Sequence, residues 1–233
     1  MAFWWRYHVI KVNKQVKNLL AEQNQGLMFM NAKMRQAFED VRLSDIADIR
    51  IGHPFRGTVE QYDNGDVKVI QVKDTEATGE ITQNTVVLTQ LSTKKQPDWL
   101  QNGDVLFVAK GAKHFSVLVE QVLERTVCSP HFFVVRIKPS LRDVILPDFL
   151  CWQLNQQPAQ RYFKATAEGS MYLSIRRQVL ENVPIKVLKF EKQKQLAAMH
   201  RCGVREQNVL QQLIKNRQQQ LEAIAIHALE SVS

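Results

Sequence analysis

The sequence predicts an α+β fold, in which a mixed, mainly antiparallel β domain with flanking helices is followed by a long C-terminal coiled-coil helix. Five or six short runs rich in β-branched and aromatic residues lie between residues 59 and 137. Because no helices alternate regularly with these runs, a doubly wound parallel sheet is disfavoured. Helical patterns return at residue 146, and the segment from Phe190 to about Leu229 contains no Pro and spaces its apolar residues three and four apart.

The length of 233 residues allows one main globular domain beside the long helix. We expect a helical lead-in at 1–40, a globular domain at 41–187 and the long helix at 188–233. The formal net charge of +8 favours a polyanionic partner, and nucleic acid is the commonest. Three widely spaced cysteines indicate neither a disulfide framework nor a zinc site, which fits a reducing cytoplasm. No apolar run is long enough to predict a membrane span.

The first half of the globular domain is predicted to be rich in strands. A short helix capped by Ser44 is expected first. The Asn64-Gly65 pair predicts a hairpin between Val59–Tyr62 and Val67–Val72. Further strands are predicted at 85–89, 104–109, 115–122 and 131–137.

Prolines and small polar residues mark the helices that follow. Pro147 suits the first position of a helix, and Pro158 breaks or restarts that helix. Ser174 is expected to cap a short helix that runs through Leu180.

The long helix carries a narrow apolar seam that predicts a partner helix. Gly203 interrupts the seam at a cost of about 1 kcal/mol relative to Ala, and an extra step of four residues there predicts a local unwinding of the supercoil. Forty residues of helix extend roughly 60 Å, so we expect the helix to meet a second copy or another protein. The alternative is a helix folded back over its own domain. The residues proposed for dimerisation are Leu196, Met199, Leu210, Ile214, Leu221 and Ile224.

Basic and polar side chains gather on four loops, three of which contain glycine, and these are the candidate nucleic-acid contacts. Such loops suit DNA recognition because phosphates are held by cations and base edges by cations, amides and hydroxyls. The alternative for each residue is a solvated surface charge. The four clusters are Arg50, His53 and Arg56; Lys94 and Lys95; Lys110, Lys113 and His114; and Ser170, Tyr172, Arg176 and Arg177.

An enzymatic site is not indicated. Lys110-Gly111-Ala112-Lys113 lacks the Gly-Lys-Ser/Thr ending of a phosphate-binding loop. His53, His114, His131 and Cys128 have no motif that frames a nucleophile and its base. We therefore expect a protein without catalytic residues, metal or cofactor.

Five motifs occur in the same order as in a known family. They are Leu43–Ile49 followed by Gly52; Leu100-Gln101-Asn102-Gly103-Asp104-Val105-Leu106; Leu146–Leu154; Glu168-Gly169-Ser170; and Val183-Pro184-Ile185 before Phe190–Gln195. In this order they resemble the DNA-specificity subunits of type I restriction-modification systems. Members of that family carry two target-recognition domains and two conserved helices, whereas this chain resembles a half-subunit with one of each. The second Pro that usually precedes the conserved helix is missing between Lys186 and Lys189.

The resemblance implies a non-catalytic protein that binds double-stranded DNA and directs other subunits. A methyltransferase subunit and a restriction subunit, which bind S-adenosylmethionine and ATP, are the partners it implies. It further implies a homodimer that recognises an interrupted palindrome. The alternative function is a basic coiled-coil adaptor that binds proteins rather than DNA.

Overall fold

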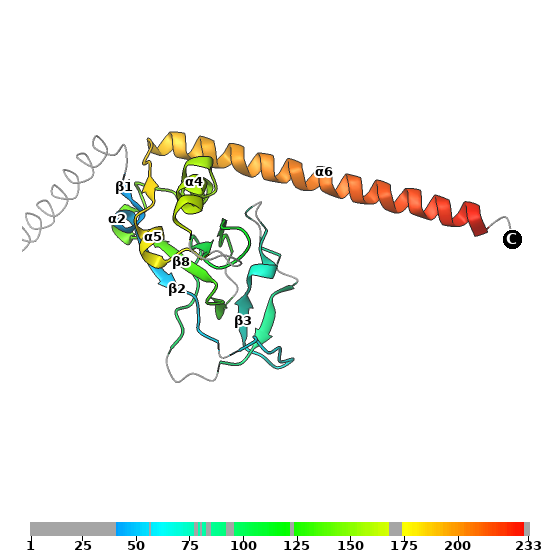
Figure 1. Ribbon diagram of the computed structural model, residues 1–233, viewed down its shortest axis with the longest axis horizontal. Coiled ribbons are helices and arrows are strands. Elements are labelled where there is room, and N and C mark those ends of the chain that lie inside the picture. Colours follow the sequence, from blue (N-terminus) through cyan, green and yellow to red (C-terminus); the bar gives the residue numbers. More distant parts are fainter. Residues whose placement is uncertain are drawn as a thin grey trace, which may run out of the picture.

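The computed structural model describes residues 41–55, 57–76, 79, 81–82, 85–91, 96–121, 124–167 and 174–230. The predicted lead-in at 1–40 lies outside these residues. Figure 1 shows a globular domain from which one long helix, α6 (Phe190–Glu230), projects far to one side. The predicted α+β class and the long C-terminal helix are confirmed.

The domain contains two main sheets. In the larger sheet the antiparallel strand order is β2-β8-β5-β6, and in the smaller it is β4-β3-β7, where β3 and β7 are parallel. A short antiparallel pair, β1-β9, lies at the start of α6. The strands are β1 (Val41–Arg42), β2 (Ala47–Ile51), β3 (Val67–Ile70), β4 (Val87–Thr89), β5 (Val105–Val108), β6 (Ser116–Leu118), β7 (Thr126–Cys128), β8 (Phe132–Ile137) and β9 (Pro184–Ile185).

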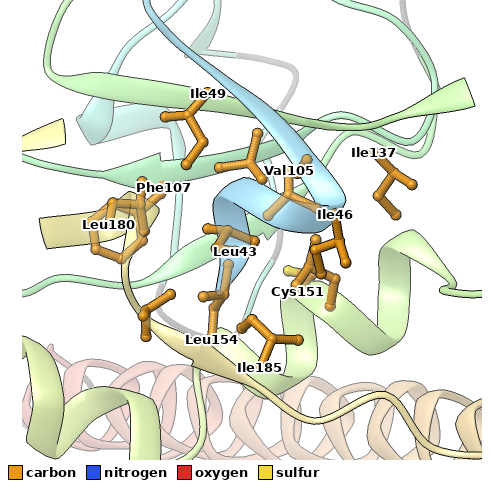
Figure 2. Close-up of a cluster of buried hydrophobic side chains, with 14 of the residues drawn as sticks. Leu43, Ile46, Ile49, Val105, Phe107, Ile137, Cys151, Leu154, Leu180 and Ile185 are labelled. Atoms are coloured by element: carbon orange, nitrogen blue, oxygen red, sulfur yellow. The ribbon is translucent and has the colours of Figure 1, made fainter. Parts of the chain in front are cut away.

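The two inner strands of the larger sheet, β5 and β8, are buried on both faces, whereas β2 exposes Asp48 and Arg50 on one face. Successive side chains of a strand point to opposite sides of the sheet. Val105 and Phe107 of β5 face the helices, where they join the main core (Figure 2). Leu106 and Val108 face the smaller sheet and pack with Ile70. The helices are α2 (Leu43–Ile46), α3 (Pro147–Leu154), α4 (Gln157–Thr166) and α5 (Arg177–Glu181), with 3-10 turns η1 (Val72–Asp74) and η3 (Pro139–Leu141).

The prediction of a hairpin at the Asn64-Gly65 pair was wrong in its first arm. A turn does form, because the Gly65 amide donates to the Tyr62 carbonyl at 2.9 Å. Residues 59–62 nevertheless form no strand, since β4 and β7 occupy the two sides of β3. A Cβ at Gly65 would lie 2.6 Å from the Thr89 nitrogen, so glycine lets β4 approach closely.

Two predicted helix caps were also wrong. Ser44 lies inside α2, whose preceding residue is Arg42, and the Arg42 amide donates to the Asp45 carboxylate at 3.1 Å. Hydrogen bonding from the Arg42 side chain also lowers the pKa of Asp45. Ser174 forms a β-bridge with Lys110, and the residue before α5 is Arg176. Pro147 is the first residue of α3, and Pro158 is the second residue of α4, where the chain restarts as a helix.

One buried amide fixes the base of α6 to the domain. Gln193 has no exposed surface, and its Nε2 donates to the carbonyls of Val144 at 2.8 Å and Leu188 at 2.7 Å. Its Oε1 accepts the Leu146 amide at 2.9 Å. Ala197 is buried one turn further on. The first turns of α6 are therefore part of the domain, whereas its second half is exposed.

Candidate nucleic-acid interface

Two segments with candidate residues, 52–55 and 109–114, meet the segment 129–131 at one end of the larger sheet. The end of β2 and the end of β5 both lie opposite the start of β8, because Ile51 pairs with Phe133 and Val108 with Phe132. Beyond the strands, the Gly52 amide donates to the Phe132 carbonyl at 3.0 Å. We call the segments 52–55, 109–114 and 129–131 the loop end of the sheet.

The third and fourth basic clusters adjoin one another at this loop end. The Ile175 amide donates to the Ala109 carbonyl at 2.9 Å, next to the β-bridge between Lys110 and Ser174. This contact brings the segment of Lys110 and Lys113 beside Arg176 and the start of α5. All three side chains are exposed, as is Arg177, which pairs with Glu181 at 2.7 Å. The arrangement concentrates positive charge where phosphates can approach it.

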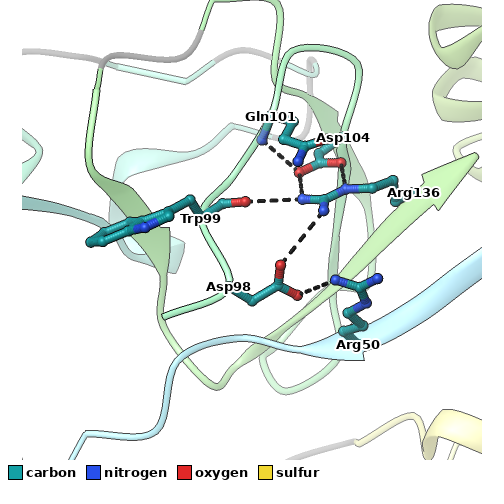
Figure 3. A network of polar contacts seen from close by, with 6 residues as sticks. All are labelled: Arg50, Asp98, Trp99, Gln101, Asp104 and Arg136. Carbon is teal, nitrogen blue, oxygen red and sulfur yellow. Dashed lines mark hydrogen bonds and ion pairs between the residues drawn. The ribbon is translucent and has the colours of Figure 1, made fainter. Parts of the chain in front are cut away.

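Arg50 connects the first cluster to the segment that follows the second. Its Nη1 donates to the Asp98 carboxylate at 2.8 Å (Figure 3), and both side chains are about half exposed. Arg136 of β8 contacts the same carboxylate at 3.5 Å. Arg50 is therefore an ion-pair partner in this structure, and a phosphate would compete with Asp98 for it.

A buried ion pair holds this segment in place. The Asp104 side chain is 1% exposed and accepts the Nε and Nη2 of Arg136, each at 2.7 Å. Arg136 also donates to the Trp99 carbonyl at 3.0 Å, and Asp104 accepts the Gln101 amide at 2.8 Å. The hydrogen bond to Asp104 raises the pKa of Arg136, so the guanidinium stays charged. The ion-pair roles of Asp98, Asp104 and Arg136 were not predicted, although Gly103-Asp104 next to an apolar strand was a usable signal.

Two predicted histidine contacts differ from expectation. His114 is only 9% exposed, its Nδ1 donates to the Val108 carbonyl at 3.0 Å, and its ring stacks on Phe107. It is a core residue rather than a surface contact, because the chain turns inward after Lys113. His53 lies at the loop end against Phe55, and burial lowers its pKa, so its ring is mainly neutral at pH 7.

The remaining candidates divide into two groups. Arg56, Lys94, Lys95, Ser170 and Tyr172 lie outside the described residues. On α6, Met199, Leu210, Ile214, Leu221 and Ile224 are between 53% and 70% exposed, whereas Leu196 is partly buried against the core of its own domain.

The described residues contain no group of three or more His, Cys, Asp or Glu side chains placed to hold a metal ion. In that same part of the chain, no helix is long and apolar enough to cross a membrane.

The fold therefore defines a mixed domain with a cationic loop end and a long helix that exposes an apolar seam. Residues 36–223 match the type I restriction modification DNA specificity domain. This span covers most of the chain, and the chain belongs to that family. Among curated proteins, none matches the sequence.

Two solved structures have a similar fold. One is the HsdS subunit from Thermoanaerobacter tengcongensis, with 18% identity and a TM-score of 0.54 over 76% of this chain and 44% of that chain. The other is described as "Structural basis underlying complex assembly and conformational transition of the type I R-M system", with 20% identity and a TM-score of 0.59 over 84% of this chain and 49% of that chain. The chain thus spans less than half the length of each.

Proposed function

We propose that this protein recognises one half of a bipartite DNA target and pairs with a second copy through α6. In this proposal the domain at 41–187 contacts DNA through its loop end, and the helix at 188–233 holds two such domains apart. Methylation and cleavage reside in a methyltransferase subunit and a restriction subunit, and the complex acts on DNA in the cytoplasm. The protein itself contributes recognition and no bond chemistry.

The observation that carries the proposal is the exposed apolar seam on α6 beyond the domain. Leu210, Ile214, Leu221 and Ile224 are 53%, 60%, 58% and 65% exposed. Four large apolar side chains aligned on one helix face favour a protein partner. A second copy supplies an identical seam and gives a two-fold axis. Two identical domains about such an axis contact the same bases on opposite strands, so the target is an interrupted palindrome.

The test of dimerisation compares seam variants with a neighbouring variant. Replacing Ile214 and Leu221 together with Ala is expected to give a monomer by light scattering at micromolar concentration. Replacing Leu213, which lies beside the seam, is expected to have a smaller effect. A wild-type protein that is monomeric at this concentration would contradict the proposal.

The test of recognition uses DNA retained by the purified complex. The chain is purified with the products of neighbouring genes, and the retained or methylated DNA is sequenced. We expect one interrupted palindrome and an affinity whose logarithm falls with the logarithm of salt concentration. A protein adaptor would retain no defined DNA sequence.

We place the methyltransferase contact near Phe190 and the first turns of α6. We extend this contact to a groove of about 600 Å³ that lies further along the helix, between residues 200–212 of α6 and the domain, and Ile81, Leu118, Val204 and Arg205 are among its lining residues. It lies on a different side of α6 from the seam, so a dimer leaves it open. Val204→Asp is expected to prevent recovery of a co-expressed methyltransferase in mild salt while the protein stays dimeric. Recovery at the wild-type level would contradict this placement.

A further inference from the structure

Two features of the α6 seam have no explanation within a single chain. A Cβ added at Gly203 would meet nothing within 4 Å. Glycine weakens a helix relative to alanine, so neither packing nor backbone conformation in this chain requires it. Gln207 and Arg217 are both exposed, and they are the two polar residues at the seam positions that lie between Gly203 and Ile224.

We infer that two copies of α6 pack antiparallel in the register that places Leu210 opposite the partner's Ile214. This register deepens the proposed homodimer and rests on it. In antiparallel helices, each step back along one corresponds to an equal step forward along the other. Gln207 therefore lies opposite the partner's Arg217, and Gly203 lies opposite the partner's Leu221. This single register therefore gives a partner both to Gly203 and to the polar residues of the seam.

The glycine forms a notch for a large side chain. Small residues at a helix interface let the partner approach closely, and a leucine fills the space that a missing side chain leaves. Because the space beside Gly203 is empty in the single chain, the partner's Leu221 can enter it without displacing any residue.

Gln207 and the partner's Arg217 are complementary as acceptor and donor. The Gln207 amide oxygen accepts from a guanidinium, and the neighbouring Glu206 places a carboxylate on the same edge of the seam as the partner's Arg217. Alternative registers lose this match. A shift of one heptad in one direction places Arg217 opposite the partner's Ile214. A shift in the other direction places Leu210 opposite the partner's Gln207.

The register puts the two-fold axis at the level of Gln212. Leu213 is 58% exposed, lies beside the seam within one residue of the axis, and meets its own copy there. This contact gives the register a signature that can be measured by cross-linking.

The first experiment uses a substitution that should stabilise the helix of the single chain but weaken the dimer. Gly203→Ala strengthens the isolated helix, whereas the proposed notch makes the dimer weaker, by about tenfold in dissociation constant for each overpacked methyl group, and the symmetric dimer contains two. In a Leu221→Ala background the same substitution is expected to lose most of this effect. Gln219→Ala, on the opposite side of the helix, is the matched control and should leave the dissociation constant of the dimer unchanged or lower it. Equal or tighter association of Gly203→Ala would overturn the notch.

The second experiment measures the register directly in full-length protein with Cys202→Ser. Under mild oxidation, Leu213→Cys is expected to form a disulfide-linked dimer with itself, and Gln220→Cys is not. Self-linking of Gln220→Cys, or linking of the two variants only when they are mixed, would indicate a shifted register. Self-linking of Leu221→Cys would indicate parallel helices. Either result overturns the inference but leaves the homodimer intact, whereas a monomer by light scattering contradicts the homodimer itself.

Discussion

Replacing Asp104 with Asn is expected to destabilise the domain strongly. The Asp104 carboxylate accepts three hydrogen bonds, two from Arg136 and one from the Gln101 amide, at 2.7 to 2.8 Å. Asn removes the negative charge and turns an NH₂ group towards these donors. Breaking one partner of a buried ion pair costs about 3–5 kcal/mol. The lower end applies here, because Asp98 remains 3.5 Å from Arg136.

The expected change in thermal midpoint follows from the size of the protein. For 150–250 residues, each kcal/mol shifts the midpoint by about 2–4 °C, so a loss of about 3 kcal/mol lowers it by roughly 6–12 °C. Thermal unfolding followed by circular dichroism measures this shift, and urea titration measures the free energy of unfolding.

A double variant separates the cost of an unpaired charge from the value of the pair. Asp104→Leu combined with Arg136→Met replaces both groups by apolar side chains of similar size, and such replacements are often neutral or stabilising. We expect it to recover most of the stability lost in Asp104→Asn. A midpoint for Asp104→Asn within 2 °C of wild type would refute the reasoning.

Three further results are expected. Changing Arg176 and Arg177 together to Ala should weaken binding to every DNA sequence and make the affinity depend less steeply on salt concentration. Arg142→Ala, which lies outside the proposed interface, should change neither. Unchanged DNA affinity in a folded double variant would count against the interface. Deleting 213–219 from the middle of α6 should bring the two domains closer by roughly 10 Å and shorten the preferred gap by about three base pairs, as sequencing of retained DNA will measure. In the native protein Cys202 should react with a thiol reagent while the two buried cysteines, whose pKa values are raised by burial, should not; more than one fast-reacting thiol would contradict the described burial.

The sequence predicted the elements whose pattern is local. The run of β8 and the strand that ends at Val108 were visible as β-branched and aromatic segments, and α6 was visible as a long run without Pro. Strand β7 was not identified, because three residues form a strand here only through their parallel pairing with β3. The sequence separation between those strands leaves no local signal.

The candidate site was predictable in composition but not in geometry. Lys110 and Arg176 were identified as basic loop residues, yet their proximity depends on a backbone contact between Ala109 and Ile175. His114 was misplaced, because a histidine after a basic loop has the same local sequence whether its ring is exposed or stacked on Phe107. The Asp98 partner of Arg50 lies 48 residues away in sequence, so no spacing rule indicated it.

The buried amide of Gln193 restrains the direction in which α6 leaves the domain. From Gln193 to Glu230 the helix extends roughly 55 Å at 1.5 Å per residue. A tilt of about 4° at its base would displace the far end by about 4 Å, which is more than the 3.4 Å rise of one base pair. Two hydrogen bonds that the Gln193 side chain donates and one that it accepts restrain that tilt where a small error would be amplified most. In the proposed dimer, a loosened base would therefore make the distance between the two domains less well defined before it weakened the fold.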